Sequence, residues 1–203
     1  MFITFEGPEG AGKSTVLAHL TDELRSLGYH VLLTKEPGAG DVGQAIRKLL
    51  LDGGELEPRT ELFLFLADRS EHISKIVGPA LKRGDIVLCD RHCDSTLVYQ
   101  GIGRGFDIEK LREWNAFATD NLKPDMTILL DVQSEVGLER IRDKNRLDRE
   151  PLRFHHMVRH GFLQLAAEDP SRWEIIDATA RAEDVFRSVL AKVLPKLPPV
   201  SPS

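Results

Sequence analysis

The stretch Gly7-Pro8-Glu9-Gly10-Ala11-Gly12-Lys13-Ser14 decides how the rest of the chain is interpreted. It fits the pattern G-x-x-x-x-G-K-[ST] at every fixed position. Glycines let a backbone wrap closely around a phosphate, and the N–H groups of such a loop form a nest for anions. A helix that starts at Ser14 would add the positive end of its dipole. The stretch therefore predicts a nucleoside triphosphate site in which Lys13 reaches the β- and γ-phosphates and Ser14 offers a hydroxyl to Mg²⁺.

Short apolar segments alternate with segments of helical periodicity along the whole chain. Phe2–Glu6 runs directly into the phosphate loop, and apolar residues spaced from Val16 to Leu27 predict the helix that follows it. The same patterns predict further strands at 30–34, 85–90, 125–131 and 173–177, and further helices at 44–51, 58–81 (with Gly78-Pro79 as the place for a break), 95–121, 136–144, 152–167 and 182–194. Strands separated by helices favour a parallel sheet covered on both faces. We expect a three-layer α/β/α fold of the phosphate-loop NTPase type, with a five-stranded parallel sheet.

Composition excludes several classes of protein. The chain has 203 residues, with 27 Lys+Arg against 32 Asp+Glu, so its net charge of −5 argues against a general nucleic-acid coat. No apolar run approaches the ~18–20 residues that span a bilayer, Met1–Glu6 lacks the features of a signal peptide, and Cys89 and Cys93 cannot build a disulfide framework. We expect a cytoplasmic protein without nucleic-acid or membrane partners, with one domain at 1–194 and a disordered, proline-rich tail at 195–203.

Three classes of phosphate-loop protein compete for this chain. Asn121-Leu122-Lys123-Pro124-Asp125 lacks the spacing of the N-K-x-D signature of GTPases, and Leu88-Cys89-Asp90-Arg91 lacks the Asp-Glu end of motor and transport ATPases. A small-molecule kinase needs a second anion site, and it therefore predicts arginines beyond the loop. The chain supplies arginines near predicted strand ends and in one crowded polar segment, which also holds Lys144: Arg47, Arg69, Arg91, Arg140, Arg142, Arg146 and Arg149.

At these residues the chain resembles the bacterial thymidylate kinase family, from Phe2 to about Leu194. The resemblance is carried by the phosphate loop within Phe5–Thr15, by Thr34-Lys35-Glu36-Pro37-Gly38, by Leu66-Ala67-Asp68-Arg69, by Asp90-Arg91-His92-Cys93-Asp94-Ser95-Thr96-Leu97-Val98-Tyr99-Gln100-Gly101, by Leu147-Asp148-Arg149-Glu150 and by Ile176-Asp177-Ala178-Thr179. Many families share the phosphate loop, whereas the Asp-Arg-His to Tyr-Gln stretch together with Glu-Pro-Gly is specific to this one.

The resemblance implies transfer of the γ-phosphate of ATP to dTMP, giving dTDP and ADP, with Mg²⁺ and in a homodimer. It assigns the ATP site to Gly7, Pro8, Glu9, Gly10, Ala11, Gly12, Lys13, Ser14, Thr15 and Arg140, the dTMP site to Glu9, Glu36, Pro37, Arg47, Phe65, Arg69, Arg91, Thr96, Tyr99 and Gln100, and the metal to Ser14 and Asp90. By the same resemblance, Arg91 and Arg47 grip the acceptor phosphate, and Phe65 stacks on thymine. Arg69, Thr96 and Gln100 contact the base edge, Glu9 holds the 3′-hydroxyl, and Tyr99 crowds the 2′ position.

The resemblance also implies a mobile lid at about 142–150. The family has one layout with an arginine in the phosphate loop and another in which the lid supplies it, and the small residues Gly10 and Ala11 indicate the second. Arg149 is the first candidate to neutralise the transferred phosphoryl group and Arg142 or Arg146 the next, so the catalytic candidates are Lys13, Arg91, Arg149 and Arg142. Ala39-Gly40-Asp41 departs from the family, which commonly has a second glycine and then threonine there, and predicts a local change in turn geometry.

Two alternatives stay open at this point. A related kinase would phosphorylate UMP, CMP or another small phosphate, and a non-catalytic nucleotide-binding regulator would keep the fold without turnover. An ADP-release assay across all nucleoside monophosphates separates these possibilities.

Overall fold

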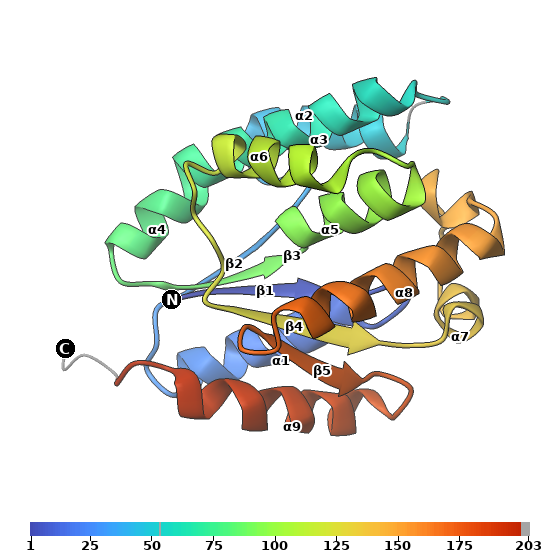
Figure 1. Ribbon diagram of the computed structural model, residues 1–203. Coiled ribbons are helices and arrows are strands. Elements are labelled where there is room, and N and C mark those ends of the chain that lie inside the picture. The colour runs from blue at the N-terminus through green and yellow to red at the C-terminus, as the bar shows by residue number, and fades with distance from the viewer. Residues whose placement is uncertain (53, 200–203) are drawn as a thin grey trace.

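The strand β1 (Phe2–Glu6) lies in the middle of the five-stranded parallel sheet of the computed structural model, which describes residues 1–52 and 54–199 (Figure 1). The strand order is β2-β3-β1-β4-β5, and every neighbouring pair is parallel. The other strands are β2 (Val31–Lys35), β3 (Ile86–Asp90), β4 (Met126–Asp131) and β5 (Trp173–Asp177). The predicted sheet is therefore confirmed.

Helices cover both faces of the sheet, which completes the predicted three layers (Figure 1). One face packs on α1 (Lys13–Ser26) and α9 (Ala182–Val193) through Phe5 and Leu130. The other packs on α3 (Pro58–His72), α4 (Gly78–Lys82), α6 (Ile108–Ala118), α8 (Leu152–Glu168) and the helical turns that follow α5 (Cys93–Thr96), through Phe2 and Leu129. Of the remaining helices, α2 (Gly40–Leu51) packs on α3, and Val136 of α7 (Ser134–Glu139) packs against the core on the α1 face.

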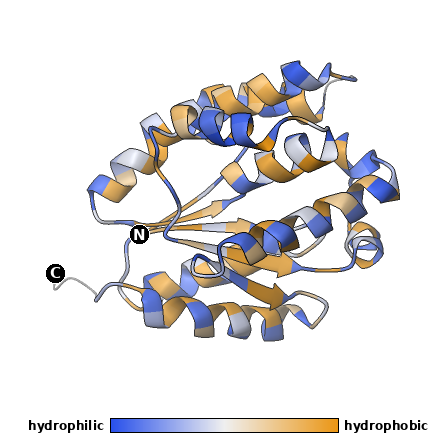
Figure 2. Ribbon diagram, viewed as in Figure 1, coloured by the Kyte–Doolittle hydropathy of each residue, from blue (hydrophilic) through white to orange (hydrophobic). Residues whose placement is uncertain are grey.

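The central strands are mostly apolar because both of their faces are covered. The exceptions are Thr4 and Thr127, whose hydroxyls pair with each other, and the acidic residues at the carboxyl ends of the strands. Figure 2 shows these strands mostly in the hydrophobic colour, whereas the helices alternate between hydrophobic and hydrophilic residues. The edge strands differ: Leu33 on β2 is 41% exposed and Ile175 on β5 is 50% exposed. Among the described residues, no helix combines the length and apolar character that crossing a bilayer requires.

Three predicted helices have different limits in the structure. Residues 58–82 stay helical through Gly78-Pro79, with a π-helical turn at Ile73–Val77. The helix predicted at 95–121 is divided, because a π-helical segment (Leu97–Gly103) gives way to a loop and Asp107 caps α6 by accepting from the backbone N–H of Lys110 at 3.1 Å. The helix predicted at 136–144 ends at Glu139, so the arginine-rich segment that follows is largely non-helical.

Two other segments, at the start of α2 and at the C-terminal end, bear on the predictions. The helix predicted at 44–51 begins earlier, at Gly40, which has a φ of 68° and lies in the stretch Ala39-Gly40-Asp41. The change in turn geometry expected for that stretch stays a prediction. At the other end, Leu194–Lys196 forms a 3₁₀ turn, Leu197 packs against the core, and the hydroxyl of Tyr29 donates to the carbonyl oxygen of Pro198 at 3.0 Å. The first residues of the predicted tail thus contact the rest of the chain, residues 200–203 lie outside the described part, and the disorder of the tail stays a prediction.

The tip of the phosphate loop interlocks with α7 through two glycines. A Cβ atom added to Gly10 would lie 1.9 Å from the carbonyl oxygen of Gly137, and one added to Gly137 would lie 2.2 Å from that of Glu9. Both obstacles are backbone, which cannot rotate away. The phosphate loop can therefore lie this close to α7 partly because Gly10 and Gly137 have no side chains.

This crossing predicts that Gly137→Ala destabilises the protein. Alanine normally stabilises a helix interior by about 0.5–1 kcal/mol relative to glycine, but here the overlap with Glu9 should reverse the sign and cost about 1–3 kcal/mol. Chemical unfolding monitored by circular dichroism measures the change. Gly54→Ala is the control, because a Cβ at Gly54 meets nothing within 4 Å. Unchanged or increased stability in Gly137→Ala would contradict the interlock.

Candidate active site

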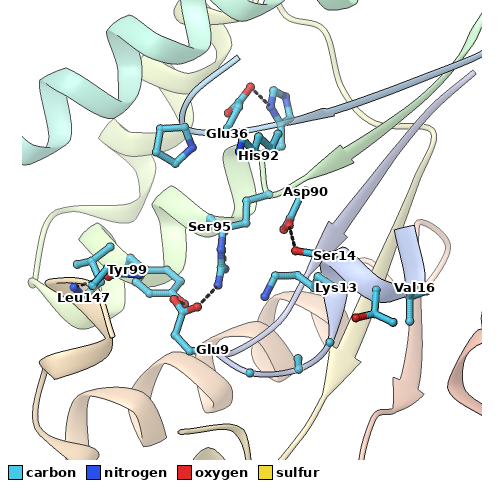
Figure 3. Close-up of a pocket in the computed structure, with 18 of the residues that line it drawn as sticks. Glu9, Lys13, Ser14, Val16, Glu36, Asp90, His92, Ser95, Tyr99 and Leu147 are labelled. Carbon is cyan, nitrogen blue, oxygen red and sulfur yellow. Dashed lines mark hydrogen bonds and ion pairs between the residues drawn. The ribbon is translucent and has the colours of Figure 1, made fainter. Parts of the chain in front are cut away.

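A cavity of about 720 Å³ lies over the carboxyl ends of the central strands, where ligands bind in open α/β sheets (Figure 3). Its walls come from the phosphate loop, from the ends of β2 and β3, from α3 and the π-helical segment, and from the residues around 140–147 and 178–185. Segments far apart in the sequence therefore meet around one space.

Lys13 begins α1 and folds back over the phosphate loop. Its ammonium group donates to the carbonyl oxygens of Gly7 and Pro8, both at 3.0 Å. Burial and the neighbouring charge of Arg91 lower the pKa of Lys13. The positive φ of 87° at Gly12 turns the chain into the helix, so the first N–H groups of α1 face the cavity mouth. The loop thus offers a cation and backbone donors to an anion.

Glu9 and Tyr99 lie together beside the loop (Figure 3), and Arg91 joins them through a bond to Glu9. Glu9 accepts from Nη2 of Arg91 at 2.9 Å and from the hydroxyl of Tyr99 at 2.8 Å. Burial alone would raise the pKa of Glu9, but the charges of Arg91 and Lys13 and these hydrogen bonds lower it to about 2. Arg91 also donates to the carbonyl oxygen of Gly7 at 3.1 Å and to Oγ of Ser95 at 3.2 Å, which fixes its guanidinium above the loop.

Ser14 and Asp90 lie next to each other at the loop. The hydroxyl of Ser14 is 3.3 Å from Oδ2 of Asp90, while Oδ1 of Asp90 is buried without a hydrogen-bond partner among the described residues. A hydroxyl and an underused carboxylate are hard oxygen ligands, so this pair fits a magnesium ion bound to phosphates.

The far side of the cavity rests on a buried network around Glu36. This carboxylate accepts from Nε of Arg69 at 2.8 Å and from Nδ1 of His72 and His92 at 2.8 and 2.9 Å. Burial would raise the pKa of Glu36, but the charges of Arg69 and His92 hold it well below its usual range.

Arg69 also donates to the side chains of Thr96 and Asn115 and to the carbonyl oxygen of His92. Together with the bond from Nε to Glu36, these contacts engage four of the five N–H groups of Arg69. A single Nη2 hydrogen is left for a ligand.

Most residues proposed from the sequence line this one cavity. They are Glu9, Gly10, Ala11, Gly12, Lys13, Ser14, Thr15, Glu36, Pro37, Arg47, Phe65, Arg69, Asp90, Arg91, Thr96, Tyr99, Gln100 and Arg140. Gly7 and Pro8 contribute the carbonyl oxygens that hold Lys13. Arg142 and Arg149 are exposed and lie outside the described lining.

Sequence reasoning missed the residues that support the site from behind. Glu6 accepts from the backbone N–H of His92 and from the hydroxyl of Ser95, and so holds the turn that carries Arg91. The signals were present, since Glu6 is an acid at the end of an apolar strand and His92 and Ser95 belong to the quoted motif. Asn145 and Leu147 also line the cavity, although neither, within the predicted lid at 142–150, was assigned a role in the site.

Comparisons with known proteins identify the family of this chain. The family model described as thymidylate kinase matches residues 5–189. The chain belongs to the thymidylate kinase family. It is 51% identical over 197 residues to the thymidylate kinase of Desulfovibrio desulfuricans, covering 91% of each chain, and 53% identical over 196 residues to that of Thermomicrobium roseum, covering 95% of this chain and 93% of the relative. The crystal structure of thymidylate kinase from Ehrlichia chaffeensis superposes with a TM-score of 0.80 at 34% identity, over 95% of this chain and 98% of that one.

Membership of the thymidylate kinase family makes the chain an ATP-dependent nucleoside monophosphate kinase. The family resemblance and the fold expected from the sequence are thereby confirmed. The GTPase and motor classes are excluded on the same grounds. The alternating pattern of strands and helices and the loop at the end of β1 are the elements that the family's fold requires.

The supporting carboxylate Glu6 predicts a pH-dependent stability. Burial and the neighbouring Asp94 raise the pKa of Glu6 from 4.5 to about 7. Between these values the folded chain binds more protons than the unfolded chain, so the stability that Glu6 contributes is full below pH 4.5 and is lost as the pH rises to 7. Unfolding titrations of wild type and Glu6→Gln should diverge over this window by on the order of 3 kcal/mol. Parallel stability curves would contradict the shift.

Proposed function

We propose that this chain transfers the γ-phosphate of ATP to dTMP and releases dTDP and ADP. The observation that carries the proposal is the double character of the cavity. One end is a phosphate loop with Lys13, and the other holds a second set of cations beside an aromatic ring, Phe65. A single-nucleotide protein has no use for the second set, whereas a nucleoside monophosphate kinase must gather two mutually repelling anions in one space.

Charge and position account for the chemistry. An oxygen of the acceptor phosphate attacks the γ-phosphorus of ATP and the bond to the β-phosphate oxygen breaks, so the phosphoryl group moves and no strong base is required. Arg91, fixed by Glu9, would hold the acceptor phosphate above the loop. Arg47, which donates to the carbonyl oxygen of Pro37 at 2.8 Å, would grip it from the other side.

The base and sugar contacts follow from the residues that remain. Phe65 offers a flat face to thymine, and the one uncommitted hydrogen of Arg69 suits the carbonyl oxygen at position 4. Thr96 and Gln100 would meet the base edge. Glu9 would accept from the 3′-hydroxyl, and Tyr99, placed against Glu9, would crowd a 2′-hydroxyl and favour deoxyribose.

The residues at the loop would hold the ATP and its metal. Ser14 and Asp90 would hold Mg²⁺, which when bound would offset the negative charge of the phosphates. Arg140 donates to the carbonyl oxygen of Ala178 at 2.9 Å, and its planar guanidinium would stack on adenine.

The segment at 142–150 would act as a lid. Arg149 first, and Arg142 next, are proposed to reach the transferred phosphoryl group when this segment closes, because both side chains are exposed and cationic. Closure would also exclude water and limit wasteful hydrolysis of ATP.

The proposed homodimer and cytoplasmic location have separate support. Three exposed aromatic residues gather on α3 and α6: Phe63 is 59% exposed, Trp114 37% and Phe117 91%. The rings of Phe63 and Trp114 lie 6.2 Å apart, so together they present an apolar face suited to a second copy of the chain. The free thiols of Cys89 and Cys93 suit a reducing compartment.

Arg91→Ala and Lys13→Ala should each lower kcat for dTMP phosphorylation by about 100-fold or more, because each removes a cation from charge that the reaction must stabilise. A coupled ADP-release assay over all nucleoside monophosphates measures this and tests the acceptor at the same time. His156→Ala is the control, since His156 pairs with Glu135 on an exposed surface. Normal turnover by Arg91→Ala, or no turnover of dTMP by wild type despite ATP binding, would refute the proposed function.

The same pocket predicts that dUMP is a poorer but measurable substrate. It differs from dTMP by one methyl group, and a hydrophobic contact of that size contributes about 1–3 kcal/mol, or a factor of about 10–200 in kcat/KM. The polar base edge is identical in the two substrates, so the remaining contacts persist. Complete inertness of dUMP at concentrations well above the KM for dTMP would contradict this pocket.

A further inference from the structure

Glu61, in the first turn of α3, is a buried carboxylate that contacts three side chains from two other segments of the chain. It is 1% exposed. Its Oε1 accepts from Nε2 of Gln100 at 3.0 Å, its Oε2 accepts from Nη2 of Arg146, and the guanidinium of Arg104 approaches both oxygens at 3.4 Å. Gln100 lines the cavity, whereas Arg146 belongs to the lid segment. One carboxylate outside the cavity lining therefore joins the pyrimidine pocket to the lid.

The ionised state of Glu61 sets how its partners must point. Burial alone would raise the pKa of Glu61, but the hydrogen bonds from Gln100 and Arg146 and the charges of Arg104 and Arg146 lower it. An ionised carboxylate can only accept hydrogen bonds. Every partner must therefore turn an N–H group toward Glu61.

For Gln100 this requirement decides which end of the amide remains for a ligand. Its NH₂ group faces Glu61, so its carbonyl oxygen is left to accept from the base. A carbonyl acceptor matches the N3–H group of thymine or uracil. It opposes cytosine, which carries a lone pair at N3, because two acceptors facing each other leave both unsatisfied.

Glu61 is also one of two groups that hold the side chain of Arg146 in the lid segment. Nε of Arg146 donates to the carbonyl oxygen of Leu50 at 2.9 Å, while its Nη2 reaches Glu61. The residues on either side of Arg146, Asn145 and Leu147, line the cavity. Farther along, Glu150 accepts from Arg104 at 2.6 Å, and Arg104 shares Glu61. The inner end of the lid is thus tied to the same carboxylate as Gln100.

We propose that Glu61 is a positioning residue that couples recognition of the pyrimidine edge to closure of the lid. Through Gln100 it presents an acceptor to N3–H, and through Arg146 it draws Asn145 and Leu147 against the occupied pocket. A base that binds the oriented amide favours the arrangement in which Glu61 also holds Arg146, so base binding and lid closure stabilise each other. This inference rests on the proposed dTMP kinase activity and assigns it a residue that need not touch substrate.

The test replaces the charge while keeping the shape of the side chain. In Glu61→Gln the new amide can either donate or accept, so it orients neither Gln100 nor Arg146. The ratio of the dissociation constants of dCMP and dTMP should fall at least about tenfold. Protection of the lid by dTMP against trypsin, followed by mass spectrometry as cleavage after Arg142 and Lys144, should be lost, while the KM for ATP stays within about twofold. Glu23→Gln, a charge removal on α1 outside the described lining, should retain wild-type behaviour in both measurements.

Arg146→Met separates the two halves of the coupling. It should abolish the dTMP-dependent protection and retain the selectivity against dCMP, because Gln100 still faces Glu61. Retention of both properties by Glu61→Gln would overturn the proposal, as would an equal loss of ATP binding, which would mark a merely structural role. If Glu61→Gln does not fold, undiminished protection in Arg146→Met overturns it instead. A wild type that fails to phosphorylate dTMP refutes the proposed function separately, before either variant is compared.

Discussion

The arginines in and beside this cavity are themselves held by carboxylates. Arg91 is paired with the half-buried Glu9 and Arg69 with the buried Glu36, and Arg146, which stands between two lining residues, is paired with the buried Glu61. A free arginine on a long side chain would sample many rotamers and would have to be ordered each time a nucleotide bound. Pairing it with a carboxylate fixes the guanidinium in advance, and the N–H groups that stay uncommitted then meet the ligand with little reorganisation.

This arrangement is costly unless each charge is matched. Removing an ion from water costs several kcal/mol, so an unpaired buried charge would destabilise the fold. The directions of the pKa shifts reflect the matching. The pKa values of Glu9 and Glu36 fall despite burial because their arginine partners outweigh the desolvation. Glu6 lacks so close a partner and sits beside Asp94, so its pKa rises to about 7. The chain thus combines a net charge of −5 with cations concentrated around one cavity.

The sequence was informative wherever structure follows from local pattern. The phosphate loop, the apolar strands and the resemblance to the thymidylate kinase family were all legible, because each depends on neighbouring residues or on short motifs. The limits of α6 and α7 were not, since a cap at Asp107 and the departure of the chain after Glu139 override helical periodicity. Pairings across the chain were also hidden. Arg146 bonds to Leu50 and Glu61, which lie 96 and 85 residues away in the sequence. Its side chain is therefore held in place, whereas Arg142 and Arg149 of the same arginine-rich segment are exposed.

The end of β3 shows how one strand serves both sides of the cavity. Arg91 has a φ of 70°, an uncommon conformation for a residue with a side chain that costs roughly 1–2 kcal/mol. Two hydrogen bonds hold the turn: the N–H of Arg91 donates to the carbonyl oxygen of Phe5 at 2.9 Å, and that of His92 donates to Glu6 at 2.8 Å.

The turn sends two consecutive side chains in different directions. Arg91 reaches Glu9 at the phosphate loop, and His92 reaches Glu36 beneath the base pocket. Arg91 and His92 belong to one strained turn, so the backbone of β1 and β3 sets the spacing between the ATP site and the acceptor site. The distance therefore does not depend on the conformations of flexible side chains. This is why the acceptor site can be built from long arginines and still keep a fixed distance from the phosphate loop.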